Sequence, residues 1–280
     1  PAGWEAVCPW KKSGSGFLIK RGAYGYNLAM ADLLGEAVMG FGNFKVCRKD
    51  INGFTFNIYT YAGWTDAHTS QICERAFKIA EYQLNLFGVD KDWDYTVIFV
   101  PNAADKKRVF GGCWALGQGY EMEKMTDRRW ELFSHRVHHM FNKYPPFGMN
   151  TSLKANRWFL EATASYFEVK SLAVLGYYSL RQGLSKLKRD YDENKDTYDS
   201  PLSMDFRKRF ETVEYLHYKK APLVAYLIDE KIKKDTNGEK SLDSFMRYVY
   251  SRYGMKRGAL DPKKELERFT GTDFNQIYDD

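Results

Sequence analysis

Residues 130–141 read WELFSHRVHHMF, and the interpretation of the whole chain depends on this stretch. It contains His135 and His139, four residues apart within an apolar-periodic segment. On a helix, residues at i and i+4 lie one above the other on the same face. Two imidazoles placed in this way can bind one metal ion, most often zinc. The stretch therefore predicts a helix that carries part of a metal site.

The residue between these histidines departs from a catalytic pattern. In the H-E-x-x-H motif of metalloproteases, the Glu is the general base. Here that position is Arg136. A guanidinium stays protonated, so it cannot take a proton from water. The metal-binding part of the motif is intact and its catalytic part is altered.

A third metal ligand is expected from the next segment, residues 157–168, which reads RWFLEATASYFE. Two helices joined by a short proline-containing connection pack as neighbours, so Glu161 can complete a His₂Glu site with His135 and His139. Two alternatives stay open at this point. The histidines can be ordinary helix residues, or a shifted pair of His135 and His138 can bind the metal.

Two more carboxylates belong to the candidate site. Glu168 lies two turns beyond Glu161 on the same face, where it can accept a hydrogen bond from a ligand histidine. The alternative is a solvated carboxylate. Glu131 lies one turn before His135, so it is a candidate replacement for the general base or an ion-pair partner of Arg136.

The order of these motifs resembles that of the gluzincins, the thermolysin-like zinc peptidases with a downstream Glu ligand. The match is greatest with the glycyl aminopeptidase group, whose second helix reads like W-x-x-E-G-x-x-x-Y; here these positions are Trp158, Glu161 and Tyr166. Residues 218–224, YKKAPLV, look like that group's Y-x-K-G-A-L-V. Residues 238–254 and 271–274 resemble its C-terminal helices. The resemblance covers most of the chain.

The resemblance implies a fold, a cofactor and a set of roles. The fold would be α+β: a thermolysin-like metallopeptidase catalytic domain with a β-rich N-terminal lobe and a helical C-terminal lobe. His135, His139 and Glu161 would hold one zinc ion, and the ligand or substrate would be a peptide or protein. Tyr218 would donate to the oxyanion of the tetrahedral intermediate. The alternative for Tyr218 is a tyrosine of the core or of the cleft wall.

Two departures from the family affect the expected activity. One is Arg136. The other is Trp114, in the sequence GGCW of residues 111–114, where the aminopeptidases carry a Glu that holds the substrate's amine. We therefore expect a peptidase-like protein with weak or no peptide hydrolysis, which makes it a candidate pseudoenzyme. The alternatives are a peptide- or anion-binding module, in which Arg136 clamps a carboxylate, and an active hydrolase that uses another base such as Glu131.

Strand patterns come first in the 280 residues and helical patterns later, which favours an α+β fold. We expect a strand-rich segment at 1–63, the edge or remnant of an upstream β domain, and a metallopeptidase-like catalytic domain at 64–280. The polar residues 181–210 predict a loop with one short helix. The expected longer helices cover residues 65–88, about 154–175, about 222–234 and 241–253, and the histidine helix, which begins at Asp127 and ends before Pro145.

Composition excludes several classes of protein. The net charge of +6 is modest and its basic residues are interleaved with acids, so we expect no nucleic-acid site. No apolar run approaches a membrane span. The cysteines, Cys8, Cys47, Cys73 and Cys113, lack C-x-x-C spacing and are either buried thiols or two disulfides of an exported protein. The chain starts at Pro1, so we expect that an upstream part was removed, and with the cysteines this leans toward export.

Overall fold

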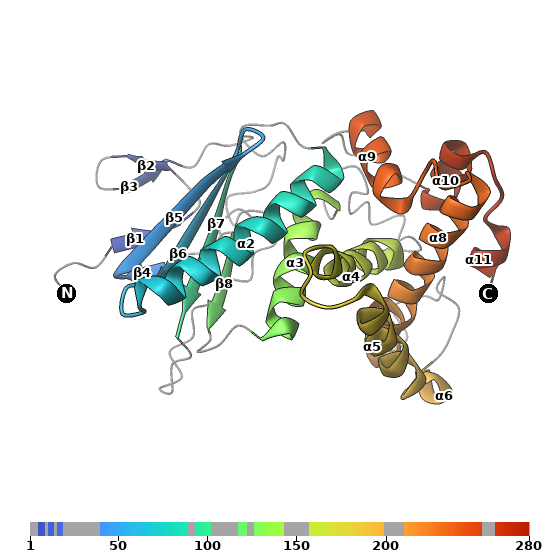
Figure 1. Cartoon of the computed structure of the whole chain (residues 1–280), viewed down its shortest axis with the longest axis horizontal. Coiled ribbons are helices and arrows are strands. Elements are labelled where there is room, and N and C mark those ends of the chain that lie inside the picture. Colours follow the sequence, from blue (N-terminus) through green and yellow to red (C-terminus); the bar gives the residue numbers. More distant parts are fainter. Residues whose placement is uncertain are drawn as a thin grey trace. The chain divides into compact units, whose positions relative to one another are not determined.

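The computed structural model divides into two compact units. The first comprises residues 1–84 and 89–130, and the second residues 85–88 and 131–280. Strands gather in the first unit and helices in the second (Figure 1), which confirms the predicted α+β class. The structure describes residues 5–8, 11–13, 16–18, 40–88, 93–101, 117–121, 126–142, 157–198, 210–253 and 261–279.

The first unit is built on a four-stranded sheet in the order β5-β6-β7-β8. These strands are β5 (Phe44–Ile51), β6 (Phe54–Tyr61), β7 (Trp93–Val100) and β8 (Gly117–Glu121). The β5–β6 pair is antiparallel, and β7 and β8 run parallel to β6. Asn52 and Gly53 close the β5–β6 hairpin with φ values of 53° and 79°, as a two-residue type I′ turn requires.

Two smaller pairs of strands precede this sheet. They are β1 (Glu5–Val7) with β4 (Gly40–Gly42), and β2 (Lys11–Ser13) with β3 (Gly16–Leu18). The four-stranded sheet takes strands from both sides of residue 63. The division of the chain at that residue stays a prediction.

Helix α2 (Asp66–Phe87) connects β6 to β7 and is drawn in front of the sheet in Figure 1. Its buried stripe comprises Ile72, Ala76, Ile79, Ala80 and Leu84. A disulfide between Cys47 and Cys73 joins β5 to α2, and Lys49 pairs with Glu81 across the same two elements. Gly88 follows the helix with φ 65°, the left-handed conformation that suits the C′ position.

The disulfide bears on the two alternatives for the cysteines. The alternative of four buried thiols is wrong, because Cys47 and Cys73 are bonded to each other. Cys8 is half-buried, and Cys113 lies outside the described residues. The second predicted disulfide therefore stays a prediction.

The second unit is helical, with α4 (Arg157–Val174) packed against α5 (Leu180–Asp192), the π-helical turn η2 (Leu216–Lys220) and α8 (Ala221–Asp235). Nearly all of α4 is buried, including polar side chains such as Glu161, Thr163 and Glu168. The other helices are α3 (Asp127–Asn142), α6 (Lys195–Tyr198), α7 (Phe210–Tyr215), α9 (Leu242–Tyr253), α10 (Pro262–Thr270) and α11 (Asn275–Asp279). Within the described ranges, no helix has both the length and the apolar character that crossing a bilayer requires.

The loop predicted for residues 181–210 is wrong in its first part, which is helix α5. Residues 180–192 form a helix whose N-terminus has a capping box between Ser179 and Gln182. Only Gly183 and Leu187 are buried along it, so the segment resembles a solvated loop in composition. Its helical state comes from the cap and from packing on α4, and a count of apolar residues misses both. Residues 199–209 lie outside the described part.

A buried carboxylate, Asp229 on α8, ties three helices together. Its Oδ2 accepts hydrogen bonds from the Tyr166 hydroxyl (2.6 Å) and Lys170 Nζ (3.0 Å), both on α4. Its Oδ1 accepts from the N–H of Leu242, the first residue of α9 (2.8 Å). The fully buried charge is thus neutralised and hydrogen-bonded, which keeps its burial from being destabilising.

Candidate metal centre

The site forms where α3 and α4 run antiparallel in the second unit. Their polar contacts follow one another in opposite chain directions, which fixes the register of the two helices. They are Ser134 with Ser171 (2.7 Å), His135 with Glu168 (2.9 Å), His139 with Glu161 (3.0 Å) and Asn142 with the carbonyl of Leu160 (2.9 Å). All these side chains are buried, so the pairs lie in a polar seam between two apolar helix faces.

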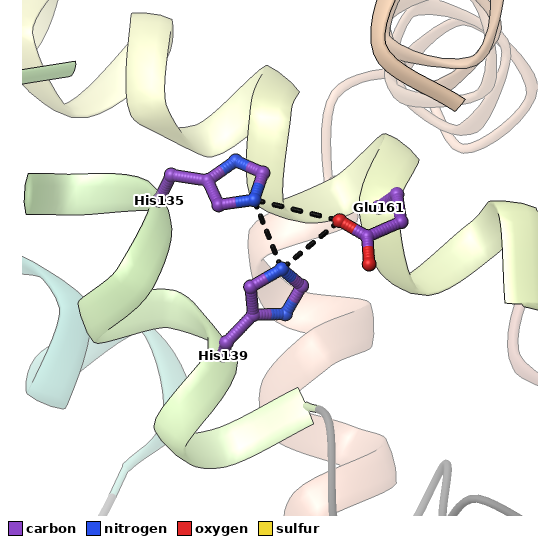
Figure 2. A group of neighbouring side chains, drawn as sticks. All are labelled: His135, His139 and Glu161. Carbon is purple, nitrogen blue, oxygen red and sulfur yellow. Dashed lines mark hydrogen bonds and ion pairs between the residues drawn. The ribbon is translucent and has the colours of Figure 1, made fainter. Parts of the chain in front are cut away.

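Three donor atoms converge in this seam (Figure 2). The Nε2 atoms of His135 and His139 are 2.9 Å apart, and Glu161 Oε2 lies 3.5 Å and 3.0 Å from them, respectively. Tetrahedral zinc with ligand distances of about 2.1 Å separates its donor atoms by about 3.4 Å. The observed separations, 2.9 to 3.5 Å, fit one such ion after shifts of a few tenths of an ångström. In the described part of the chain, this is the group of side chains that could hold a metal.

Both histidines present Nε2 because their other nitrogens are occupied. Nδ1 of His135 lies 2.9 Å from a carboxylate oxygen of Glu168, and Nδ1 of His139 lies 2.9 Å from Oδ1 of Asn142. When each Nδ1 carries the hydrogen of a neutral ring, each Nε2 has a lone pair that faces Glu161. Two lone pairs and a carboxylate repel one another at these distances unless a cation lies among them. The donor set therefore fits a metal ion.

The charges of the site favour a cation. Burial alone would lower the pKa of His135, but Glu161 and Glu168 outweigh burial and raise that pKa to about 9. Burial would raise the pKa of Glu161, yet the two histidines hold it well below its usual range. Glu161 and Glu168 together carry two negative charges next to the rings, which balances the charge of one divalent ion. Positive charge at the centre of the group is thus stabilised.

The structure places His138 apart from the converging group. Its buried ring stacks on Phe167, with centroids 5.2 Å apart, and also contacts Phe87 at 4.9 Å. Burial lowers its pKa well below 6.5, so the ring is neutral. Within the described residues the convergent pair is His135 with His139, so the alternative pair of His135 with His138 lacks support.

Glu131 has partners on α5 and in the turn that precedes it. Its buried carboxylate accepts hydrogen bonds from Lys186 Nζ (2.6 Å) on α5 and from the Tyr178 hydroxyl (3.3 Å). The carboxylate is held by a cation and a hydroxyl, an arrangement that favours a structural ion pair over a general base. Arg136, at the base position, is half-buried on α3 while its neighbours His135 and Val137 are buried.

Tyr218 lies on the π-helical turn η2, beside His135. The N–H of Ala221 donates to the carbonyl of Leu216, five residues back, so the turn is one residue wider than an α-helical turn. The Tyr218 and His135 ring centroids are 6.0 Å apart, and Tyr218 is 38% exposed. An exposed hydroxyl-bearing ring beside a metal-binding group can contact a bound ligand. Such π turns are frequent at functional sites.

Trp114, Asn142 and Ser165 complete the list of residues that bear on the site. Trp114 is in a part of the chain that the structure does not describe. Asn142 and Ser165, which contact the two histidines, were missed. The available signal for Asn142 was its position three residues after His139, on the same helix face.

Comparison with known proteins gives matches only among solved structures. No protein-family model matches the chain, and no curated protein matches it significantly. An aminopeptidase N family protein from Idiomarina loihiensis matches with a TM-score of 0.70 and 18% identity, covering 99% of this chain and 52% of that protein. An M1 zinc metallopeptidase from Deinococcus radiodurans matches with a TM-score of 0.59 and 14% identity, covering 100% and 61%.

Native yeast LTA4 hydrolase also matches, with a TM-score of 0.55 and 10% identity over 86% of this chain and 39% of that one. The chain spans about two fifths to three fifths of the length of these three proteins. At such low identity the likeness concerns the fold. The chain has the fold of an M1, gluzincin-type metallopeptidase catalytic domain, with a buried group of two histidines and a glutamate that could hold a metal ion.

Proposed function

We propose that this chain is a zinc-binding, aminopeptidase-related metallopeptidase domain in which peptide hydrolysis is weak or absent. The observation that carries the proposal is the convergence of His135, His139 and Glu161, with each histidine Nδ1 held by a second residue. These three residues would be the zinc ligands. The motif resemblance to the glycyl aminopeptidases and the M1 fold support a peptide as the ligand.

The chain's own residues explain why the activity is expected to be weak. Bound zinc would act as a Lewis acid and lower the pKa of its water. The position of the residue that would accept a proton from this water is occupied by Arg136, which stays protonated. Glu131, the other candidate base, is engaged by Lys186 and Tyr178. Tyr218, which is exposed beside His135, would donate to a negatively charged oxygen of the ligand.

A second candidate function is a binding module without catalysis. The observation that favours it is the half-buried Arg136 next to His135 of the metal-binding group. A guanidinium binds a carboxylate through two parallel hydrogen bonds. Together with a metal ion, Arg136 would favour ligands with a carboxylate, such as the C-terminus of a peptide.

Metal content tests the shared premise of both candidates. We expect one zinc ion per chain by elemental analysis of protein purified without chelator, and loss of this zinc in His139→Ala. His68→Ala removes a half-buried histidine of α2, outside the site, and should leave the zinc content unchanged. Wild-type protein that stays free of zinc after incubation with the metal would refute the proposal.

Hydrolysis of peptides with a free N-terminus separates the two candidates. The first candidate predicts slow, chelator-sensitive cleavage that His135→Ala abolishes. The second predicts no cleavage, with zinc-dependent peptide binding that weakens in Arg136→Ala. Efficient cleavage at the rates of ordinary metallopeptidases, lost in His135→Ala, would contradict both.

A further inference from the structure

A buried amide, Asn142 at the end of α3, contacts the second histidine of the metal-binding group. The side chain is fully buried, one turn beyond His139. Its Oδ1 lies 2.9 Å from Nδ1 of His139. Its Nδ2 donates to the carbonyl of Leu160 (2.9 Å) and to Oγ1 of Thr163 (3.1 Å), both on α4. The amide therefore connects a candidate metal ligand to the neighbouring helix.

The surroundings of Asn142 determine which way its amide faces. The Leu160 carbonyl can only accept a hydrogen bond, so the amide nitrogen must point toward α4. The single hydrogen of the Thr163 hydroxyl is directed to the carbonyls of Phe159 and Leu160, so its oxygen accepts from the amide. The amide oxygen is then left for His139, and it can only accept. Nδ1 of His139 must carry the hydrogen, which leaves the Nε2 lone pair facing His135 and Glu161.

We propose that Asn142 is a positioning residue of the metal site, which fixes both the tautomer and the ring orientation of His139. This inference rests on the proposed zinc site. Residues that hold a ligand histidine in this way usually change metal affinity by 10- to 100-fold when they are removed. The two histidines are held by different chemistry, His135 by the carboxylate of Glu168 and His139 by a neutral amide.

The neutral amide has a consequence for the charge of the site. Glu161 and Glu168 already balance one divalent ion, so a third carboxylate at position 142 would leave a net negative charge in a buried seam. Asn142 supplies the same acceptor without that charge. It also uses its nitrogen to fasten α3 to α4, which a carboxylate cannot do.

The test measures the zinc dissociation constant of the metal-free protein by competition with a chelator of known affinity. Asn142→Leu removes the acceptor and should weaken zinc binding by about 10- to 100-fold. Asn142→Asp keeps an acceptor for His139 but loses both bonds to α4, so it should retain zinc affinity while losing stability. Ser134→Ala is the matched control, because it breaks the buried Ser134–Ser171 bond between the same helices. It should lose stability and keep its zinc affinity.

The outcomes separate this inference from the proposed function. Wild-type protein without zinc affinity refutes both. If a folded Asn142→Leu variant keeps wild-type zinc affinity, the positioning role is refuted and the zinc site is not. The same holds if Asn142→Asp binds zinc as weakly as Asn142→Leu. A second readout needs no variant: nitrogen NMR of the zinc-loaded wild type should show the proton of His139 on Nδ1. A proton on Nε2 would overturn the inference.

Discussion

At the scale of single residues, the proposed loss of peptide hydrolysis rests on position 136. The Arg136 side chain adds a positive charge to a segment whose other ionisable groups suit a cation. Glu161 and Glu168 supply two negative charges to the polar seam, which balance one divalent ion. Arg136 removes the proton acceptor from the position that follows His135.

Arg136→Glu should restore hydrolysis if the rest of the site is competent. We expect an increase of about 10²- to 10⁴-fold in peptide cleavage over the wild type, which is the usual contribution of a general base. Cleavage of a peptide with a free N-terminus, with and without chelator, checks this. Arg136→Gln removes the charge without adding a base, so it should remain as slow as the wild type. Equal gains in both variants would show that the charge, and not the missing base, silences the site.

At the scale of elements, the helix pair α3 and α4 carries the candidate site. Sequence reasoning predicted both helices and their neighbourhood, because histidine spacing and an apolar Trp158-containing segment are local signals. It left the register open between pairs that include His138 or His139. The choice follows from the packing of the His138 ring against Phe87 and Phe167, which leaves His139 to face Glu161. This packing depends on side chains from other helices.

The ionic contact of Asp229 makes a stability prediction at the same scale. Burial would raise the pKa of Asp229, but Lys170, the Tyr166 hydroxyl and the N–H of Leu242 together lower it below its ordinary 3.8. Asp229→Asn should lower the free energy of unfolding by about 1–3 kcal/mol at neutral pH, the usual penalty for losing a buried charge-assisted bond. Denaturant unfolding measures this. Glu230→Gln, which breaks an exposed pair with Lys233, should cost less than about 1 kcal/mol.

The pH dependence of the Asp229 contribution has a definite sign. The pKa is lower in the folded state, so the stabilisation is present above about pH 3.8 and is lost as the pH falls through the folded pKa. The stability gap between the wild type and Asp229→Asn should therefore be constant from pH 7 to about pH 5 and shrink in more acidic solution. A gap that widens with acid would contradict the assignment.

At the scale of the whole molecule, the two units differ in what stabilises them. The first unit has a disulfide from Cys47 to Cys73 across β5 and α2, which closes a loop with a sequence separation of 26. The second unit relies on apolar helix packing, the Asp229 network and the polar seam of the candidate metal site.

Reduction of the disulfide should destabilise the first unit. Closing a loop of this length restricts the unfolded chain by about 3–4 kcal/mol in the loop-entropy estimate. Urea unfolding with and without a reductant measures the loss. A Cys47→Ala, Cys73→Ala double variant should be as unstable as the reduced protein and insensitive to the reductant. Alkylation of both sulfurs in unreduced wild-type protein would contradict the bond.

The sequence by itself determined the helix with its histidines, the candidate third ligand Glu161 and the α+β class. These are set by residue spacing and by the order of periodic patterns along the chain, which are local properties. The sequence did not predict helix α5, because its helical state comes from a cap and a neighbouring helix and not from apolar periodicity. The tertiary structure alone decided the convergence of the three donor atoms, the pairing of Glu131 with Lys186, and the contact of Asn142 with His139. Such contacts join side chains from separate segments at distances of about 3 Å, and only the packing of whole helices sets those distances.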